Sequence, residues 1–236
     1  MATLWVVMSF CVPVGNGQLS IQIDHYVGQK VMELDTVYYR NALGQQFTVT
    51  KFKYYISNLS LQSVAGKTVK LDEYFLINEE EPVSKRFDWA NIPEGAYSDI
   101  SFVLGVDSVH NLTGLQTGAL DPINAMFWTW NTGYIFLKLE GKSPASTSSG
   151  NIFEYHIGGF KAPANSIRTI TLHFSKPLII SNNGTHLLHL KADALEVLQG
   201  PTTIDFSKLS SVTDAHNAPM VANNYMDMFS VIDDAK

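Results

Sequence analysis

Short segments that alternate apolar and polar residues recur along almost the whole chain, and they constrain the fold more than any other feature. Most are rich in β-branched or aromatic residues and are bounded by Gly, Pro, Asn or Ser, as half-buried strands usually are. They cover residues 19–24, 47–54, 55–61, 69–71, 74–77, 100–106, 134–140, 152–157, 170–174 and 187–192. So many short strands, with no long helical pattern, predict an all-β protein. We expect an antiparallel β-sandwich of immunoglobulin-like or jelly-roll-like type.

Helical signals are confined to the C-terminal part of the chain. Residues 191–198 are expected to form two helical turns that stop at Gly200 and Pro201, and a second short helix is expected within residues 215–228. Residues 141–150 are rich in Ser and Thr and are typical of a polar loop. No internal repeat or change of composition marks a linker, so we expect residues 18–236 to form a single domain.

The N-terminus resembles an export signal. Residues 4–14 form an apolar run that is too short to span a bilayer, and Gly15-Asn16-Gly17 follows with small residues where a signal peptidase would cleave. The basic region that normally precedes such a run is missing, which suggests a truncated start. We therefore expect residues 1–17 to be a signal peptide. The mature chain would have no membrane span and would lie in the periplasm, outside the cell or on its surface. The alternative is a first β-strand of the core.

Composition and motifs exclude several classes of function. The net charge of −6 comes with no basic patch, so nucleic acid is not an expected partner. The chain has no nucleophile elbow, phosphate-binding loop or dinucleotide fingerprint, and we do not expect an enzyme. Its one cysteine, Cys11, lies in the predicted signal peptide. A mature chain without cysteine excludes disulfides and thiolate metal sites.

Residues 120–134 hold an aromatic cluster. Trp128 and Trp130 are separated by one residue, with Met126 and Tyr134 close by. In a strand, residues two apart point to the same face, so the two indole rings are expected to lie side by side. They could fill a core, or be kept together because something acts on them. They could also form, with Tyr134, a stacking platform of a secreted carbohydrate-binding or adhesion module.

The seven histidines are the main candidates for metal binding, because a cysteine-free site must use imidazole, carboxylate or thioether ligands. His110 and His156 lie beside glycine-containing segments, and His216 lies near several methionines. Weaker candidates are His25, Met126 and Met220. His173, His186 and His189 alternate with apolar residues as ordinary sheet-surface positions do. No paired spacing of a zinc motif is present, so each histidine is also compatible with a purely hydrogen-bonded role.

Five motifs in this order resemble the MbnP-like family from about Leu19 to Phe229. They are Gly105-Val-Asp-Ser108, Gly118-Ala-Leu-Asp-Pro122, Met126-Phe-Trp-Thr-Trp-Asn-Thr-Gly-Tyr134, Tyr155-His-Ile-Gly158 and a closing Asp-Ala-His-Asn (214–217) followed by Met-Phe (228–229). The Trp-x-Trp-x-x-Gly-Tyr block is the most specific of them. Two positions depart from the methanotroph members of the family: Ala125 stands where Gly often precedes the Met, and Gly159-Phe-Lys161 follows the His-Ile-Gly block.

The resemblance implies an exported bacterial β-sandwich protein that binds copper. It also implies a partner, a di-haem enzyme of the cytochrome c peroxidase or MauG-like class (MbnH-type), which oxidises one tryptophan to kynurenine. Trp128 or Trp130 would be that tryptophan. His156, together with His110 or His216, would be copper ligands.

Overall fold

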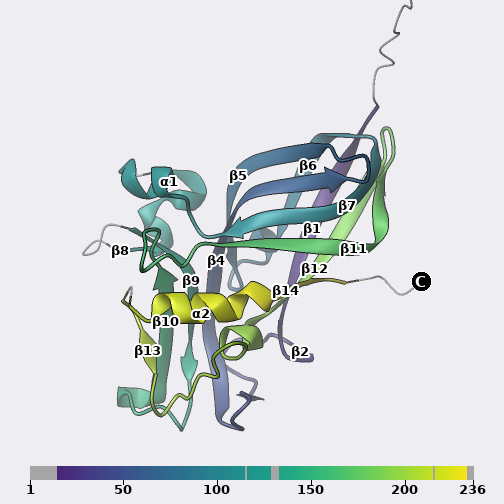
Figure 1. Ribbon diagram of the computed structural model, residues 1–236. Helices are drawn as coiled ribbons and strands as arrows, with labels where there is room; N and C mark the ends of the chain where they lie inside the picture. The colour runs from purple at the N-terminus through teal and green to yellow at the C-terminus, as the bar shows by residue number, and fades with distance from the viewer. Residues whose placement is uncertain (1–14, 115, 129–132, 215, 233–236) are drawn as a thin grey trace, which may run out of the picture.

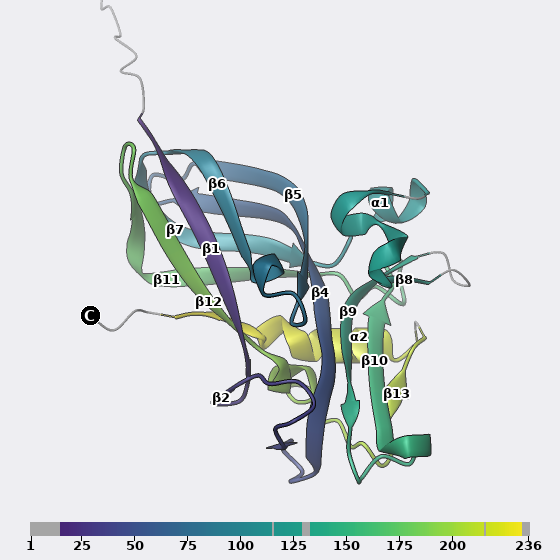
Figure 2. The same cartoon turned by 180° about the vertical axis from the view of Figure 1, so that it is seen from behind.

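The computed structural model of the protein describes residues 15–114, 116–128, 133–214 and 216–232. Of these described residues, 51% are in strands and 15% in helices, and the strands form two sheets. The predicted all-β, sandwich-like fold is therefore confirmed. Figures 1 and 2 show that the two sheets face each other over one half of the molecule, while the larger sheet continues beyond the smaller one.

The smaller sheet is built around β1 (Asn16–Val27). Its other strands are β14 (Phe229–Val231), β12 (Thr185–Asp193), β2 (Lys30–Val31) and β6 (Arg86–Pro93). The sheet order is β14-β12-β1-β2, and β6 also pairs with β1. The pairing of β1 with β12 is parallel, whereas the sequence predicted antiparallel strands throughout. No hairpin joins these two strands, which lie far apart in the chain, so local turn geometry does not set their direction.

The larger sheet is built around β4 (Gln46–Ser63), an 18-residue strand that covers two consecutive segments of the sequence prediction. The order is β11 (Arg168–Ile180), β7 (Gly95–Leu104), β4, β9 (Gly133–Lys142), β10 (Ile152–Gly158) and β13 (Ser211–Val212). The strands β3 (Tyr39–Arg40) and β5 (Thr68–Asn78) also pair with β4, and β8 (Phe127–Trp128) pairs with β9. The first half of β4 pairs with β9 and the second half with β7. The pairing of β10 with β13 is parallel, a second departure from the prediction.

The helices are short. In the described ranges they are α1 (Ser108–Leu112), α2 (Ala218–Asn224) and the 3-10 turns η1 (Pro82–Lys85), η2 (Gly118–Leu120), η3 (Pro122–Asn124), η4 (Ser149–Asn151), η5 (Ala194–Val197) and η6 (Tyr225–Asp227). The short helix predicted within residues 215–228 is confirmed. The helix predicted for residues 191–198 is wrong, because β12 continues to Asp193 and only η5 follows. The Asp193 side chain accepts a hydrogen bond from the backbone N–H of Leu195 and so begins a single turn there. No helix in the described part of the chain is long and apolar enough to cross a membrane.

Aromatic side chains join the two sheets. Phe75 of β5 stacks on Phe87 of β6 with ring centroids 4.4 Å apart, and Phe102 of β7 meets Phe229 of β14 edge to face at 4.9 Å. Beyond the smaller sheet, α2 packs against β10. On one side of β10, Phe153, Tyr155 and Ile157 are fully buried. The other side carries Glu154 and His156, and His156 belongs to the candidate site.

Candidate functional site

Trp128 packs on the end of β10. A Cβ atom added to Gly158 would stand 2.7 and 2.9 Å from Cζ3 and Cη2 of the Trp128 indole, so the ring packs directly over this glycine. Gly158 follows His156 by two residues and lies at a register shift between β10 and β9. Trp128 therefore contacts the strand that carries His156, two residues beyond it. The residue is 6% exposed and belongs to the buried apolar core.

His156 is oriented by a carboxylate. Its Nε2 atom lies 2.8 Å from Oε1 of Glu140 on the neighbouring strand β9, and its side chain is largely buried. The hydrogen bond from His156 lowers the pKa of Glu140 to about 2, against the opposing effect of partial burial. A carboxylate can only accept, so Nε2 carries the hydrogen, and Nδ1 is the ring nitrogen that a metal could use. Metal-binding histidines typically have this arrangement, in which the carboxylate orients the ring.

Lys138 lies directly opposite His156 in the ladder between β9 and β10. It is 7% exposed, and its Nζ donates a 2.6 Å hydrogen bond to the backbone carbonyl of Ala125. Burial lowers the pKa of this amine, because the ammonium form loses hydration. Ala125 has a left-handed backbone, with φ of 56°, in the turn before β8. Lys138 therefore holds the segment that leads into Trp128.

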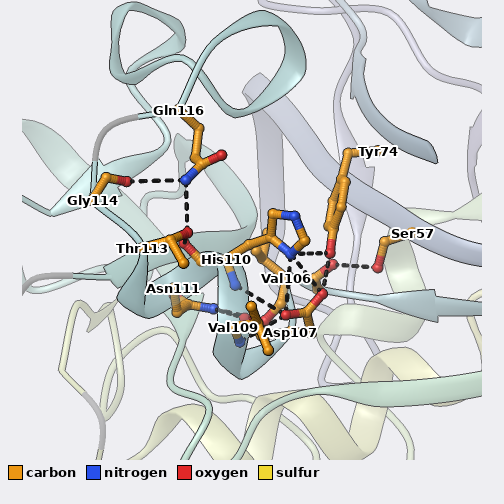
Figure 3. Close-up of polar contacts among 11 residues, drawn as sticks. Ser57, Tyr74, Val106, Asp107, Val109, His110, Asn111, Thr113, Gly114 and Gln116 are labelled. Atoms are coloured by element: carbon orange, nitrogen blue, oxygen red, sulfur yellow. Dashed lines mark hydrogen bonds and ion pairs between the residues drawn. The ribbon is translucent and has the colours of Figure 1, made fainter. Parts of the chain in front are cut away.

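His110, in α1, is also oriented by a carboxylate. Its Nδ1 lies 3.0 Å from Oδ2 of Asp107 and 2.8 Å from the Tyr74 hydroxyl, which also donates to Asp107 (Figure 3). Burial raises the pKa of Asp107, but the hydrogen bonds from Tyr74 and His110 outweigh it and lower that pKa. Nδ1 of His110 therefore carries a hydrogen, and Nε2 keeps the lone pair. Asp107 also caps α1 by accepting from the N–H groups of Val109 and His110.

Asn111 ties α1 to the start of β9. Its Nδ2 donates to the carbonyls of Val106 and Asp107, and its Oδ1 accepts from the N–H of Tyr134 at 3.0 Å. Figures 1 and 2 both show α1 and β8 at the same end of the molecule. The helix that carries His110 is therefore fixed to the strand that pairs with Trp128.

His216 is exposed and lies in the turn between β13 and α2. Because β13 runs parallel to β10 with Val212 beside Tyr155, the chain beyond it continues toward the Gly158 end of β10. The three histidines predicted as ligands thus come from three different segments. Within the part of the chain that the structure describes, no three His, Cys, Asp or Glu side chains form a metal-binding group.

The weaker candidates have other roles. His25 is buried, and both of its ring nitrogens have partners: Nδ1 meets Glu79 at 2.7 Å and Nε2 meets the Tyr54 hydroxyl at 2.8 Å. Met126 is fully buried, and Met220 packs against the core from a partly exposed position. His173, predicted as a surface position, is 82% exposed and pairs with Asp99.

Tyr134 is buried, and its hydroxyl donates a 2.8 Å hydrogen bond to the carbonyl of Leu120. With Trp128 also buried, neither residue offers an open ring to a sugar, which weighs against the stacking platform. Trp130, and with it the expectation that the two indoles share a face, lies outside the described residues.

Glu140, Lys138 and Asp107 contribute to the site but were not predicted from the sequence. Lys138 and Glu140 alternate with buried apolar residues in β9, so their pattern marks a polar face. Asp107 precedes His110 by three residues at the start of a helix, which is the spacing of a capping carboxylate. The pairing of His156 with Glu140 depends on the register of two strands, for which the sequence carries no local signal.

These features define a mainly β scaffold with two carboxylate-oriented histidines and a packed tryptophan at one end. The MbnP family profile matches residues 16–217, and the chain belongs to this family. The structure of MbnP from Methylosinus trichosporium is similar over 94% of this chain and 100% of its own, with a TM-score of 0.56 and 13% identity. At that identity the likeness concerns the fold alone. A comparison with curated protein sequences found no match.

Proposed function

We propose that the protein is an exported copper-binding protein, not itself an enzyme, in which Trp128 or Trp130 is oxidised to kynurenine by a di-haem partner of the cytochrome c peroxidase class. One observation carries the proposal. Trp128 packs on Gly158 of β10, two residues beyond His156, whose ring is oriented by Glu140. A candidate ligand and a candidate oxidation target thus share one small region of a protein of the MbnP family.

Kynurenine would supply the metal ligands that the unmodified residues lack. His156 offers one neutral imidazole nitrogen, and the described residues hold no group of three donors around it. Kynurenine has an aromatic amine and a ketone in place of the indole, and both are possible donors. A mixed nitrogen and oxygen site with imidazole suits copper, which stands at the top of the divalent affinity order. His216 and His110 are the further histidines that could take part.

Under this proposal, the partner enzyme acts at one end of the larger sheet. Trp128 lies there in the two-residue strand β8, which pairs with β9, and its indole packs on Gly158. A partner that oxidises this ring would dock at that end of the sheet. The apolar segment 4–14 and the small residues after it support export, so that modification and copper binding would occur in the periplasm or at the cell surface.

Copper titration of the oxidised protein tests the ligand assignment. His156→Ala should lose the site, and Glu140→Gln should weaken copper binding by roughly 10–100-fold, because the ring loses its orienting carboxylate. His173→Ala is the matched control, since its imidazole is also paired with a carboxylate but lies on the exposed face of β11. Copper binding should also weaken as the pH falls, because protons compete with the metal for the imidazole lone pair. Wild-type affinity in His156→Ala would refute the site.

Intact-mass measurement of protein co-expressed with the partner enzyme tests the modification. Wild-type protein should gain the mass of kynurenine formation, and exactly one of the variants Trp128→Phe and Trp130→Phe should lose that gain. If both variants still gain the mass, this pair of residues is not the target.

A further inference from the structure

Three side chains form a hydrogen-bonded chain through the interior between the two sheets. Tyr54 lies on β4 of the larger sheet, His25 on β1 of the smaller sheet, and Glu79 directly after β5. The Tyr54 hydroxyl is 2.8 Å from Nε2 of His25, and Nδ1 of His25 is 2.7 Å from Oε2 of Glu79. Tyr54 and His25 are buried, whereas Glu79 reaches the edge of the sandwich, where Nζ of Lys85 lies 2.7 Å from the same oxygen.

The hydrogens in this chain have a defined direction. Burial raises the pKa of Glu79, but the hydrogen bonds from His25 and Lys85 outweigh it and lower that pKa, so Glu79 is a carboxylate that only accepts. Nδ1 of His25 must then carry a hydrogen. Burial lowers the pKa of His25, so the ring is neutral and Nε2 holds a lone pair. The Tyr54 hydroxyl therefore donates to Nε2.

This arrangement distinguishes Tyr54 from the other deeply buried tyrosines. The hydroxyls of Tyr55, Tyr134, Tyr155 and Tyr225 each donate to a backbone carbonyl. A carbonyl oxygen accepts a hydrogen bond but does not hold a proton near neutral pH, whereas imidazole does. Among the described tyrosines, Tyr74 also meets a titratable base, but it is only partly buried.

We propose that Tyr54 is a redox-active tyrosine, with His25 as the base that takes its proton. A high-potential one-electron oxidant removes one electron from the phenol and is itself reduced by one electron. The O–H bond of Tyr54 breaks, and the proton moves to Nε2 of His25. The products are a neutral tyrosyl radical and an imidazolium, and reduction by one electron returns the proton to the oxygen.

The surroundings support both products. The imidazolium lies against the Glu79 carboxylate, so the positive charge formed in the interior is paired with a negative one. The Tyr54 ring packs against Phe52 and Phe229, with centroids 5.2 and 5.6 Å away, which shields a radical from solvent. Since the proton stays inside the protein, oxidation requires no release of a proton to water. This site is separate from Trp128 and does not rest on the copper proposal.

Photochemical oxidation of the recombinant, unmodified protein tests the inference. Ruthenium(III) tris-bipyridine, generated by a light flash with persulfate as the terminal acceptor, is the oxidant, and electron paramagnetic resonance of frozen samples detects the radical. Wild-type protein should give a long-lived tyrosyl signal, and Tyr54→Phe should lose it. Tyr55→Phe is the matched control, because Tyr55 is the next residue of β4 and is also fully buried. This variant should retain the signal.

Two outcomes would overturn the assignment. One is a tyrosyl signal of wild-type size in Tyr54→Phe. The other is an equal loss in Tyr55→Phe or in Tyr74→Phe, which would trace the signal to packing or to the second tyrosine–base pair. If Tyr54→Phe does not fold, fluorotyrosine incorporated at position 54 retains the hydroxyl. Its radical must then show a fluorine hyperfine splitting, and an unsplit spectrum overturns the proposal.

Discussion

Gly158→Ala should test whether the Trp128 indole depends on the absence of a side chain in β10. The added Cβ would lie 2.4 Å from the Tyr134 carbonyl oxygen and 2.7 Å from the indole, both well inside van der Waals contact. The φ angle of Gly158 lies outside the left-handed region, so crowding rather than backbone strain is tested. The Tyr134 oxygen belongs to the backbone and cannot rotate away. The strands or the indole must therefore move.

The expected magnitude follows from these contacts. Overpacking typically costs 1–3 kcal/mol, and a clash with a fixed backbone atom places this variant in the upper half, at about 2–3 kcal/mol. For a protein of this size, each kcal/mol lowers Tm by roughly 2–4 °C, so the fall should be about 4–12 °C. The indole, which is less constrained than the carbonyl, should also become more exposed.

Thermal unfolding followed by circular dichroism measures the first effect. Modification of Trp128 by N-bromosuccinimide, quantified in its peptide by mass spectrometry, measures the second. Glu154→Ala is the control, because Glu154 lies in the same strand and its truncation creates no crowding. If Gly158→Ala unfolds at the temperature of the control and Trp128 reacts no faster, the packing of the indole on Gly158 is refuted.

Three further predictions concern stability. The pKa of Glu140 in the folded protein is about 2, below its ordinary value of 4.5. This carboxylate therefore stabilises the fold above pH 4.5, and the contribution is lost as the pH falls toward 2. In Glu140→Gln, the urea midpoint of unfolding should fall less steeply over this pH range than in the wild type. Burial lowers the pKa of His25, so below about pH 6.5 the unfolded chain binds more protons than the folded protein. The free energy of unfolding should therefore fall as the pH drops through that value. A folded His25→Gln variant should not show this decrease. Asn111→Ala removes three hydrogen bonds and leaves the Tyr134 N–H without its acceptor, which should cost about 2–4 kcal/mol in urea unfolding; an undiminished free energy of unfolding would show that α1 is not held by Asn111.

Much of the secondary structure could be predicted from residue order alone, because period-two alternation reports directly on which side of a strand is buried. Residues 47–61 contain two consecutive alternating segments, and together they form one strand, β4. Residues 191–198 illustrate the limit of this reasoning. A short stretch with apolar residues at several spacings fits the helical period as well as the strand period. In the structure, Lys191 pairs with Asp24 on β1, and the strand β12 continues through this part of the segment.

Sequence reasoning also selected Trp128 and His156, since a paired indole motif and a histidine before glycine stand out in any chain. Only tertiary contacts bring these two residues into one region. The register of β10 against β9 places Glu140 beside His156, and Gly158 leaves the space that the indole fills. Such contacts join segments that share no local pattern.

The histidines show the same division most clearly. Residue type alone determined that any metal site in a cysteine-free chain would rely on imidazole. Only the tertiary structure decided which nitrogens are available: both nitrogens of His25 are used between the sheets, whereas His110 and His156 each keep one. The physical reason is that a ring's chemistry depends on the groups within hydrogen-bond distance, and those groups come from strands that are distant in the sequence.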